Sequence, residues 1–395
     1  MPPVTMQSTL HISVIIFWIS CAVLLYDYVG YPFLLAALAP LGRRKRVLSA
    51  DAPLPSVTLL ISAYNERQVM QPKLENCRVL QYPAHLLEII VISDCSDDGT
   101  DDVVKDYAQY GISLVRQTKR LGKSAGLNLA VPQARGEILV FSDANAMYRP
   151  DAVAHLAKHF ADPRVGYVVG NARYVENAAQ TQADEAEGLY WKLETWLKKK
   201  ESSFESVVGG DGAIYAIRRT LYTPLLATDI NDFLNPLQII DRGYLGVFEP
   251  AAVSYEETAG SFQKEFRRKV RIVSRSFNAL GRVPGVLNPF RNFRHWLLLI
   301  SHKLLRWLAP FFMLLALASS VVLWKLPLYR TAALLQFAFY ALALAAWLLP
   351  RLRAAAKPLS LAYYFCLVNL ASLVGCIKCW RGELSGTWSP PRQGA

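Results

Sequence analysis

Long stretches of this 395-residue chain contain few or no charged residues. The N-terminal stretch contains only Asp27, and the three C-terminal stretches contain no Asp, Glu, Lys or Arg. They cover residues 12–41, 307–324, 331–350 and 358–377. Because an α-helix needs about 20 apolar residues to cross a bilayer, we expect membrane-spanning helices on both sides of a polar central region.

The N-terminal stretch lacks the basic start of a cleaved signal peptide and is too long for one. It is followed by the basic residues 43–46, which favour a retained anchor with the central region in the cytoplasm. The loop at residues 351–357 should lie on the same side. Three C-terminal crossings would place the tail outside, whereas Lys378, Arg381 and Arg392 favour the inside. One segment that does not cross fully would reconcile the two signals.

Cysteine is scarce, with six scattered residues. Cys376 and Cys379 have CxxC spacing, but no second ligand pair lies nearby, so we expect neither a zinc site nor a redox site. This pattern favours a reducing compartment without structural disulfides. Much of the net charge of +12 borders the apolar stretches, which favours anionic membrane lipids as partners and disfavours nucleic acid.

Two common nucleotide-binding signatures are missing. GxGxxG does not occur at the relevant strand-to-helix turns, which disfavours a nicotinamide or flavin site. Gly122-Lys123-Ser124 lacks the earlier glycine of a phosphate-binding loop, because Gln117 occupies that position. Two interpretations of Lys123 stay open: it contacts a phosphate or nucleobase, or it is a solvated residue at the start of a helix.

The central region alternates between strand-like and helix-like segments. The strand-like runs cover residues 57–63, 87–93 and 137–142, and the helix-like segments lie near residues 69–80, 100–110 and 123–134. This alternation predicts parallel strands joined by crossover helices, and therefore a Rossmann-like α/β domain.

Polar residues follow each of these strands. Asp143 and Asn145 end the third run, Asp94 follows the second, and Tyr64-Asn65-Glu66 follows the first. Because ligands of open α/β sheets bind at the carboxyl ends of the strands, three such endings predict a site for a metal-bound nucleotide. Taken singly, each ending has a simpler explanation as a turn or a helix cap.

The central motifs resemble, in order and spacing, those of membrane-embedded family 2 inverting glycosyltransferases. This group includes cellulose, chitin-oligosaccharide, hyaluronan and poly-N-acetylglucosamine synthases. The resemblance implies a GT-A fold with interfacial amphipathic helices and transmembrane helices. The motifs are SAYNE (62–66), SDCSDDGT (93–100), GKSAGLN (122–128), SDAN (142–145), GGDGAIYAIRR (209–219), NDF (231–233), RRKVR (267–271), SHKLLRWLAP (301–310) and GTW (386–388).

The resemblance also implies roles for individual residues. Asp143 and Asn145 would hold Mg²⁺ or Mn²⁺ on the donor diphosphate, where the metal neutralises charge on the leaving group. Asp232 would be the general base that removes the acceptor proton. The donor nucleotide would be bound by Ala63, Tyr64, Glu66, Asp94, Lys123, Asp143, Arg268 and Arg271, and the acceptor by Gly210, Asp211 and Gly212.

Three positions depart from the family pattern. Asn231 precedes Asp232 where many relatives have Glu, and Asn145 replaces a second metal-binding Asp. Because an amide oxygen is a neutral ligand, metal binding should weaken rather than vanish. Ile272 stands where relatives have a Trp that lines the acceptor site, which weakens the case for processive polymerisation.

Residues 261–280 have the pattern of an amphipathic helix. Apolar side chains share one face, while Arg268, Arg271 and Arg275 lie on the opposite face. We expect an interfacial helix with its apolar side on lipid and its arginines toward the cytoplasmic domain or the headgroups. Binding of the donor diphosphate and binding of anionic lipid both explain these arginines.

Two further motifs have two interpretations each. Residues 209–212 either form the acceptor end of the site or are a glycine-rich turn before a strand. Trp388 either caps the nucleotide site from the tail or lies at the membrane surface.

Together these observations predict a multi-pass protein of the bacterial cytoplasmic membrane with a cytoplasmic catalytic domain. The leading hypothesis is transfer of a sugar from a nucleotide-diphosphate donor, UDP-linked in the resemblance, to a growing polysaccharide with a β linkage. The alternatives are single-sugar transfer to a polyprenyl-linked acceptor and a non-catalytic nucleotide-binding regulator. The expected regions are an anchor (1–46), a GT-A domain (53–260), interfacial helices (261–309), transmembrane helices (310–380) and a tail (381–395).

Overall fold

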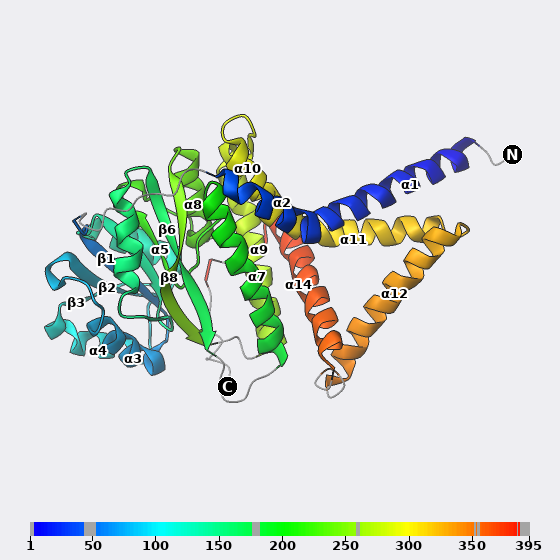
Figure 1. Cartoon of the computed structure of the whole chain (residues 1–395). Helices are drawn as coiled ribbons and strands as arrows, with labels where there is room; N and C mark the ends of the chain where they lie inside the picture. The colour runs from blue at the N-terminus through cyan, green and yellow to red at the C-terminus, as the bar shows by residue number, and fades with distance from the viewer. Residues whose placement is uncertain are drawn as a thin grey trace.

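The computed structural model describes residues 4–42, 53–175, 182–257, 261–350, 353, 356–384 and 386–387. An α/β domain lies at one end of the molecule, and long helices extend away from it (Figure 1). The chain returns to the α/β domain after the last helix, so residues 386–387 lie far from the N-terminal end of α1 (Val4–Leu25).

Eight strands form one mixed sheet in the order β3-β2-β1-β4-β7-β6-β8-β5. The first four strands along the chain pair in parallel, as the strand and helix alternation predicts. The strands are β1 (Val57–Ala63), β2 (Leu87–Ser93), β3 (Ile112–Arg116), β4 (Ile138–Asp143), β5 (Met147–Tyr148), β6 (Val165–Val175), β7 (Tyr215–Arg218) and β8 (Leu245–Glu257).

The parallel half of the sheet forms because its strands are apolar on both faces. Leu59, Leu60 and Ile61 of β1 are completely buried, since crossover helices cover the two faces of the sheet. The register pairs Ala63 with Ser93 and Ser62 with Asp143, so β1, β2 and β4 end at the same edge. This shared edge brings the polar strand ends together.

The other half of the sheet is not purely parallel. β7 runs antiparallel to both β4 and β6, and β5 runs antiparallel to β8. The sequence motif at residues 209–212 reverses the chain before β7, which is a change of direction that the strand and helix alternation alone did not predict.

The helices of the α/β domain and the helices beyond it are named as in Figure 1. The domain contains α3 (Arg67–Arg78), α4 (Thr100–Asp106), α5 (Lys123–Ala130), α6 (Ala152–Ala157), α7 (Gln182–Phe204) and α8 (Asn231–Asp241). The remaining helices are α2 (Tyr31–Leu38), α9 (Phe262–Arg282), α10 (Phe293–Leu299), α11 (Leu305–Val322), α12 (Pro327–Leu348) and α14 (Lys357–Trp380). Short 3₁₀ or π segments are η1 (Tyr26–Gly30), η2 (Ala39–Leu41), η3 (Ala84–Leu86), η4 (Ala108–Tyr110), η5 (Val131–Gln133), η6 (Lys158–Ala161), η7 (Arg219–Leu221), η8 (Pro284–Leu287) and η9 (Ile300–Leu304).

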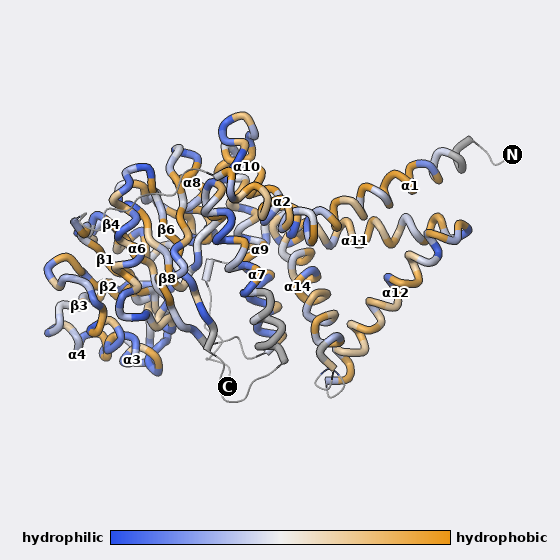
Figure 2. Tube along the Cα trace, viewed as in Figure 1, coloured by the Kyte–Doolittle hydropathy of each residue, from blue (hydrophilic) through white to orange (hydrophobic). Residues whose placement is uncertain are grey.

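Four helical segments are long and apolar enough to cross a membrane. Apolar residues cover much of α1, α11 and α12, which project away from the α/β domain (Figure 2). The segments are Ser8–Leu41, Phe293–Val322, Pro327–Leu348 and Pro358–Trp380. The chain therefore carries candidate membrane spans at both ends, as its charge-free stretches predict.

The apolar face of α9 packs on α14. The Phe262 ring lies 4.9 Å from the ring of Tyr363, and the Phe277 ring lies 6.1 Å from that of Trp380. Between these two contacts, Gly375 of α14 approaches Val273 so closely that a side chain there would collide with it. The expectation that this face lies on lipid is wrong, because the two helices run side by side in the same direction and cover each other.

Three charged residues on one face of α7 are buried, namely Glu194, Lys198 and Glu201, and the buried Glu205 follows directly after the helix. Their spacing of three or four residues places them on a single stripe of the helix. Glu201 accepts hydrogen bonds from the Tyr31 hydroxyl and contacts His302, while Glu194 contacts His302 and Arg306. This network joins the α/β domain to the helices that precede and follow it, and Arg306 also lies 3.8 Å from the buried Asp27.

Candidate active site

The ends of β1 and β2 are linked by an exchange of hydrogen bonds. The Asn65 side-chain amide donates to Asp97 Oδ1 at 2.7 Å, and the Asp97 backbone N–H donates to Asn65 Oδ1 at 3.0 Å. Asn65 has a left-handed backbone with a φ of 51°, a conformation that Asn tolerates better than most residues. This exchange fixes the turn that carries Tyr64 and Glu66.

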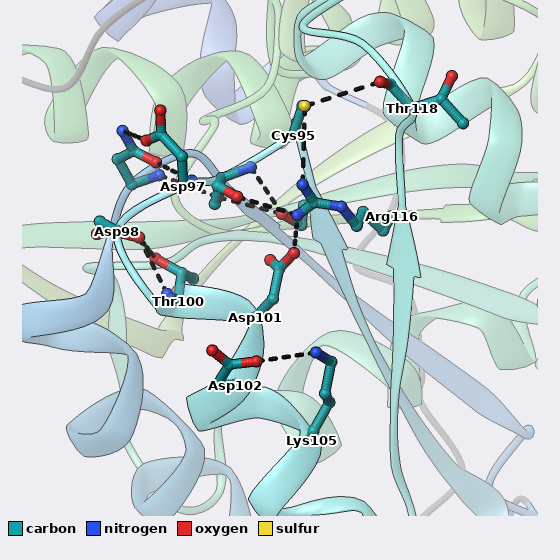
Figure 3. A network of polar contacts seen from close by, with 12 residues as sticks. Cys95, Asp97, Asp98, Thr100, Asp101, Asp102, Lys105, Arg116 and Thr118 are labelled. Atoms are coloured by element: carbon teal, nitrogen blue, oxygen red, sulfur yellow. Dashed lines mark hydrogen bonds and ion pairs between the residues drawn. The ribbon is translucent and has the colours of Figure 1, made fainter.

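A network of polar contacts supports the turn after β2 (Figure 3). Asp98 accepts hydrogen bonds from the backbone N–H groups of Arg67 and Thr100, so it caps the starts of both α3 and α4. Arg116 donates to Asp101 and to the carbonyl oxygen of Ser96. These contacts give the SDCSDDGT motif a structural role, since they hold the backbone around Asp94.

Asp94 is buried and organises the loop that precedes α5. Its carboxylate accepts hydrogen bonds from the backbone N–H groups of Leu121 and Gly122 and from the Gln117 side chain, at 2.8–3.1 Å. Gln117, which stands where a phosphate-binding loop would have glycine, is therefore part of this loop's hydrogen-bonding scaffold. Oδ2 receives only the Gly122 N–H among these donors, which leaves it capacity for a nucleobase donor.

The same loop brings Lys123 to the end of β4. Its Nζ lies 2.6 Å from Asp143 Oδ1, and both side chains are partly exposed. The nearby Tyr64 ring is covered by the Arg120 guanidinium at 3.9 Å. The structure thus gathers the predicted nucleotide residues Ala63, Tyr64, Asp94, Lys123 and Asp143 along one edge of the sheet.

Asp143 and Asp232 approach each other across Gly212. A side-chain carbon at Gly212 would lie 3.1 Å from Asp232 Oδ2 and 3.6 Å from Asp143 Oδ2. Gly210 donates its backbone N–H to the Asp232 carbonyl, so the glycine motif is tied to the start of α8. The glycines therefore keep the space between the two carboxylates free of side chains.

Asp232 lies half-buried in the first turn of α8. Burial, together with Asp211 and Asp143, raises the pKa of its carboxyl, while Lys123 and Arg271 oppose the rise. Its Oδ1 is buried and has no hydrogen-bond partner within the described part of the chain. The neighbouring Asn231 side chain donates to the Tyr215 hydroxyl at 2.7 Å and so points away to the sheet.

Arg268 and Arg271 of α9 have different surroundings. Burial and Arg275 lower the pKa of Arg271 to about 10, whereas Asp232 and Asp143 act in the opposite direction, so Arg271 stays cationic beside both carboxylates. Arg268 is paired within the helix, because its Nε donates to Glu265 Oε2 at 2.7 Å. Arg271 therefore lies close enough to Asp143 and Asp232 to interact with both carboxylates.

Two acidic residues complete the charge distribution. Asp211 forms an ion pair with Lys198 of α7 at 3.0 Å, and both are largely buried. Glu256, near the end of β8, has its pKa raised to about 8 by burial and by Asp143 and Asp211. Glu256 belongs to none of the sequence motifs. Only the tertiary structure shows that it lies near Asp143 and Asp211.

No group of three or more His, Cys, Asp or Glu side chains is arranged to hold a metal among the residues that the structure describes. A site with one or two protein carboxylates still suits Mg²⁺ or Mn²⁺ when the donor phosphates and water supply the other ligands. Asp143 is partly exposed at a strand end, and Asn145 is half-buried two residues later. These residues fit a metal that is held mainly by the donor.

The tail reaches the nucleotide loop. A side chain at Gly122 would lie 2.4 Å from the carbonyl oxygen of Gly386, and Gly386 also packs near Ala227. The predicted cap Trp388 lies outside the described residues. The contact nevertheless places Gly386 and Thr387 beside the loop that precedes Lys123.

The mixed sheet, the carboxylate at the end of β4 and a second carboxylate at the start of α8 define a GT-A type of glycosyltransferase fold. Residues 58–222 match the family described as "Glycosyl transferase family 2". This match agrees with the family resemblance of the sequence motifs.

The chain is similar to "Probable glycosyltransferase YdaM" of Bacillus subtilis, with 30% identity over 55% of this chain and 54% of the relative. It is 30% identical to the poly-beta-1,6-N-acetyl-D-glucosamine synthase of Staphylococcus epidermidis over 34% of this chain and 32% of that protein. The beta-monoglucosyldiacylglycerol synthase of Trichormus variabilis is 28% identical over 41% and 34%. The chain thus spans about half or less of the length of these relatives.

A solved structure shares the fold over nearly the whole chain. It is the mannosyltransferase PcManGT from Pyrobaculum calidifontis in complex with GDP-Man and Mn²⁺, with a TM-score of 0.65 and 23% identity. The match covers 91% of this chain and 99% of that protein. The resemblance includes the helices outside the sheet, so the predicted combination of GT-A domain and apolar helices is confirmed as a fold.

Proposed function

We propose that the chain is an inverting glycosyltransferase that uses a UDP-linked sugar and extends a glycan at the cytoplasmic face of a bacterial inner membrane. The main support for this proposal is that Asp143 and Asp232 approach each other across Gly212, with Arg271 close to both carboxylates. Such a site has one acidic end for the donor diphosphate and a base for the acceptor.

In this reaction Asp232 takes the proton of the acceptor hydroxyl as its oxygen bonds to C1 of the sugar. The bond from C1 to the diphosphate oxygen breaks at the same time, and the electron pair leaves with the nucleoside diphosphate. Attack from the side opposite to the leaving group inverts C1 and gives the β linkage. The raised pKa of Asp232 makes it a stronger base than an exposed aspartate.

The donor is held at the other end of the site. Lys123 and Arg271 are cationic donors near Asp143, and Arg suits phosphate oxygens because of its paired N–H groups. Asp143 and Asn145 would hold Mg²⁺ or Mn²⁺ there. When bound, this metal neutralises the charge that develops on the leaving diphosphate.

The nucleotide and acceptor ends share a boundary at residues 210–212. Ala63, Tyr64, Glu66 and Asp94 form the base end of the proposed donor site, and Gly210, Asp211 and Gly212 form the acceptor end. Arg268 reaches phosphate only if it leaves Glu265, so we give Arg271 the larger share of diphosphate binding.

We propose a growing polysaccharide as the acceptor, with a polyprenyl-linked glycan as the alternative. The relatives described above include both a poly-N-acetylglucosamine synthase and a synthase of a glycolipid, so they support either acceptor. Ile272 packs on the hydrophobic core rather than presenting the aromatic surface that relatives use for a sugar chain. The experiment should therefore test single-sugar transfer to a polyprenyl-linked glycan as thoroughly as polysaccharide extension.

We further propose three membrane crossings rather than four. α9 is rich in Lys and Arg and cannot lie inside the hydrocarbon, and α14 contacts it from Phe262 to Phe277. Because the two helices are parallel neighbours, α14 must lie along the membrane surface with α9. Crossings by α1, α11 and α12 then leave both the catalytic domain and the tail in the cytoplasm.

This topology agrees with the contact between Gly386 and the Gly122 loop, which requires the tail and the α/β domain to be on one side. It also resolves the conflict between the number of apolar stretches and the basic residues near the C-terminus. A C-terminal fusion to a protein that fluoresces only in the cytoplasm should be bright, whereas a periplasmic phosphatase fusion should be inactive. The opposite pattern would exclude this topology.

The full-length chain in lipid nanodiscs should be screened against a panel of UDP- and GDP-linked sugars, with Mn²⁺ and membrane lipid extracts as acceptors. We expect release of UDP from one donor and a β-linked product. A ladder of long products supports the polysaccharide synthase, and one sugar on a lipid supports the alternative. Nucleotide binding without sugar transfer from any donor would support the regulator and exclude the proposed reaction.

A further inference from the structure

A completely buried lysine lies behind the carboxylate at the end of β4. Lys73 of α3 has no exposed surface. Its Nζ donates to Ser142 Oγ at 2.8 Å and to the carbonyl oxygen of Ala146, and it lies 4.2 Å from the centre of the Tyr148 ring. The two hydrogen bonds hold the chain on either side of the turn that contains Asp143 and Asn145.

A second residue of α3, Asn76, also binds the end of this turn. The Asn76 side-chain amide donates to the Tyr148 carbonyl oxygen at 2.8 Å, and the Tyr148 N–H donates to Asn76 Oδ1 at 2.7 Å. The Tyr148 hydroxyl lies 3.0 Å from the carbonyl oxygens of Phe141 and Ala213. The turn from Ser142 to Tyr148 is therefore fixed by side chains of α3 from below and by the glycine-motif segment beside it.

Burying the Lys73 amine costs free energy because the amine loses its hydration. Desolvation lowers the pKa of Lys73, while the charges of Cys77, Asp143 and Glu256 raise it. No carboxylate lies within ion-pair distance of Nζ in the described ranges of the chain. An apolar side chain would fill the volume without the cost of burying an amine, so the amine is retained for its hydrogen bonds and charge.

We propose that Lys73 is a positioning residue for Asp143. Its two hydrogen bonds hold the Asp143 turn in one conformation from the interior of the domain. Lys123 contacts Asp143 Oδ1 at the partly exposed side of the same turn. This inference rests on the proposed function for its meaning, but its test does not depend on sugar transfer.

The test compares Lys73→Met with wild type in the full-length protein. Met preserves the length and packing of the side chain but removes both hydrogen bonds and the charge. Mn²⁺ binding is measured by electron paramagnetic resonance in the presence of UDP, and UDP binding is measured separately without metal. We expect Mn²⁺ affinity to fall roughly 10- to 100-fold, as is usual when a residue that supports a metal ligand is lost. Metal-free UDP affinity should change less than twofold.

The matched control is Lys105→Met. Lys105 lies in the same domain, but its side chain is 64% exposed and pairs only with Asp102. Mn²⁺ and UDP binding should equal those of wild type. If Lys105→Met weakens Mn²⁺ binding as strongly as Lys73→Met, the effect is one of general lysine loss and the proposal fails.

Ser142→Ala keeps the test decisive if Lys73→Met does not fold. This change removes one acceptor of the Lys73 amine and leaves Asp143 in place. We expect a smaller loss of Mn²⁺ affinity, about 3- to 10-fold, and a Lys73→Met/Ser142→Ala double variant no weaker than Lys73→Met alone. Folded variants that bind Mn²⁺ and UDP like wild type would overturn the proposal.

Sugar transfer is measured in parallel. A chain that transfers no sugar but loses Mn²⁺ affinity on Lys73→Met would contradict the proposed function and leave the role of Lys73 intact. If the chain transfers sugar but Lys73→Met changes neither kcat nor Mn²⁺ affinity, the proposed function is supported and the proposed role of Lys73 is contradicted.

Discussion

Asp143 and Asp232 come from separate elements, yet their Oδ2 atoms both lie within 3.6 Å of one point above Gly212. Asp143 ends β4, and Asp232 lies in the first turn of α8. The chain between them turns back at Gly210 and Gly212, and the Gly210 N–H binds the Asp232 backbone. The two carboxylates therefore share a space that glycine keeps open.

Replacing Gly212 by Ala should block this space. The added methyl would lie 3.1 Å from Asp232 Oδ2, which is tighter than a normal contact, while the backbone conformation suits alanine. We expect kcat to fall about 10-fold or more, as small misplacements at reacting atoms often cause. Unfolding temperature should change little, and Gly188→Ala, where the structure is open, serves as control. Wild-type turnover by Gly212→Ala would show that acceptor and donor do not meet here.

Asp232→Asn should separate binding from chemistry. Asn keeps the size of the side chain but cannot accept the acceptor proton, so kcat should fall roughly 10²- to 10⁴-fold. UDP affinity, measured by calorimetry, should remain within about threefold of wild type. Asp106→Asn at the exposed end of α4 is the control and should be fully active. Wild-type turnover in Asp232→Asn would refute the role as base.

The pH dependence of kcat/KM should report the environment of Asp232. Because its pKa is raised, the base becomes protonated at a higher pH than an ordinary aspartate, and activity should fall as the pH drops through this raised pKa. Asp211 contributes to the rise, so Asp211→Asn should move the acidic limb to lower pH. An acidic limb at the usual aspartate value in wild type, near pH 4, would contradict the assignment.

Arg271→Ala should weaken donor binding more than Arg267→Ala. Arg271 is partly buried near Asp232 and Asp143, whereas Arg267 is exposed on the same helix. Loss of a charge-assisted contact to phosphate costs about 1.5–3 kcal/mol, or roughly 10- to 100-fold in UDP affinity. Arg267→Ala should remain near wild type. Equal, small effects of both changes on UDP, with loss of binding to anionic vesicles, would favour the lipid-binding interpretation of α9.

The buried stripe on α7 should be essential for stability. Glu201 accepts a hydrogen bond from Tyr31 and contacts His302, so Glu201→Ala would leave buried polar groups without a partner. We expect a loss of about 3–5 kcal/mol in the free energy of unfolding, against about 1 kcal/mol for Tyr31→Phe. Lys199→Ala, exposed on the same helix, is the control. Thermal unfolding in detergent would detect these differences.

Much of the catalytic edge could be predicted from the sequence. The positions of Asp94 and Asp143 follow from a general property of parallel sheets, because strands of matched register end together. The glycine motif and Asp232 came from the family resemblance rather than from local pattern. Their proximity to Asp143 depends on β7 running antiparallel, which no short-range signal in the chain specifies.

The residues that the sequence did not reveal are buried charges. Lys73 and Glu201 lie in segments that look like ordinary solvated surface, and a charged stripe on a helix is usually exposed. Their partners are far away in the chain. Only the packing of one element on another decides whether such a charge meets water or a counterpart.

The sequence by itself determined which segments are apolar, which strands end in polar residues and which motif order the chain carries. Tertiary structure decided how these parts are used. α14 is apolar enough to cross a membrane, yet one of its faces packs on the charged helix α9, and this contact is the basis for the proposed position at the membrane surface. The physical reason is that the hydrophobic effect removes apolar surface from water but does not specify what covers it. Lipid and protein can cover an apolar helix face equally well.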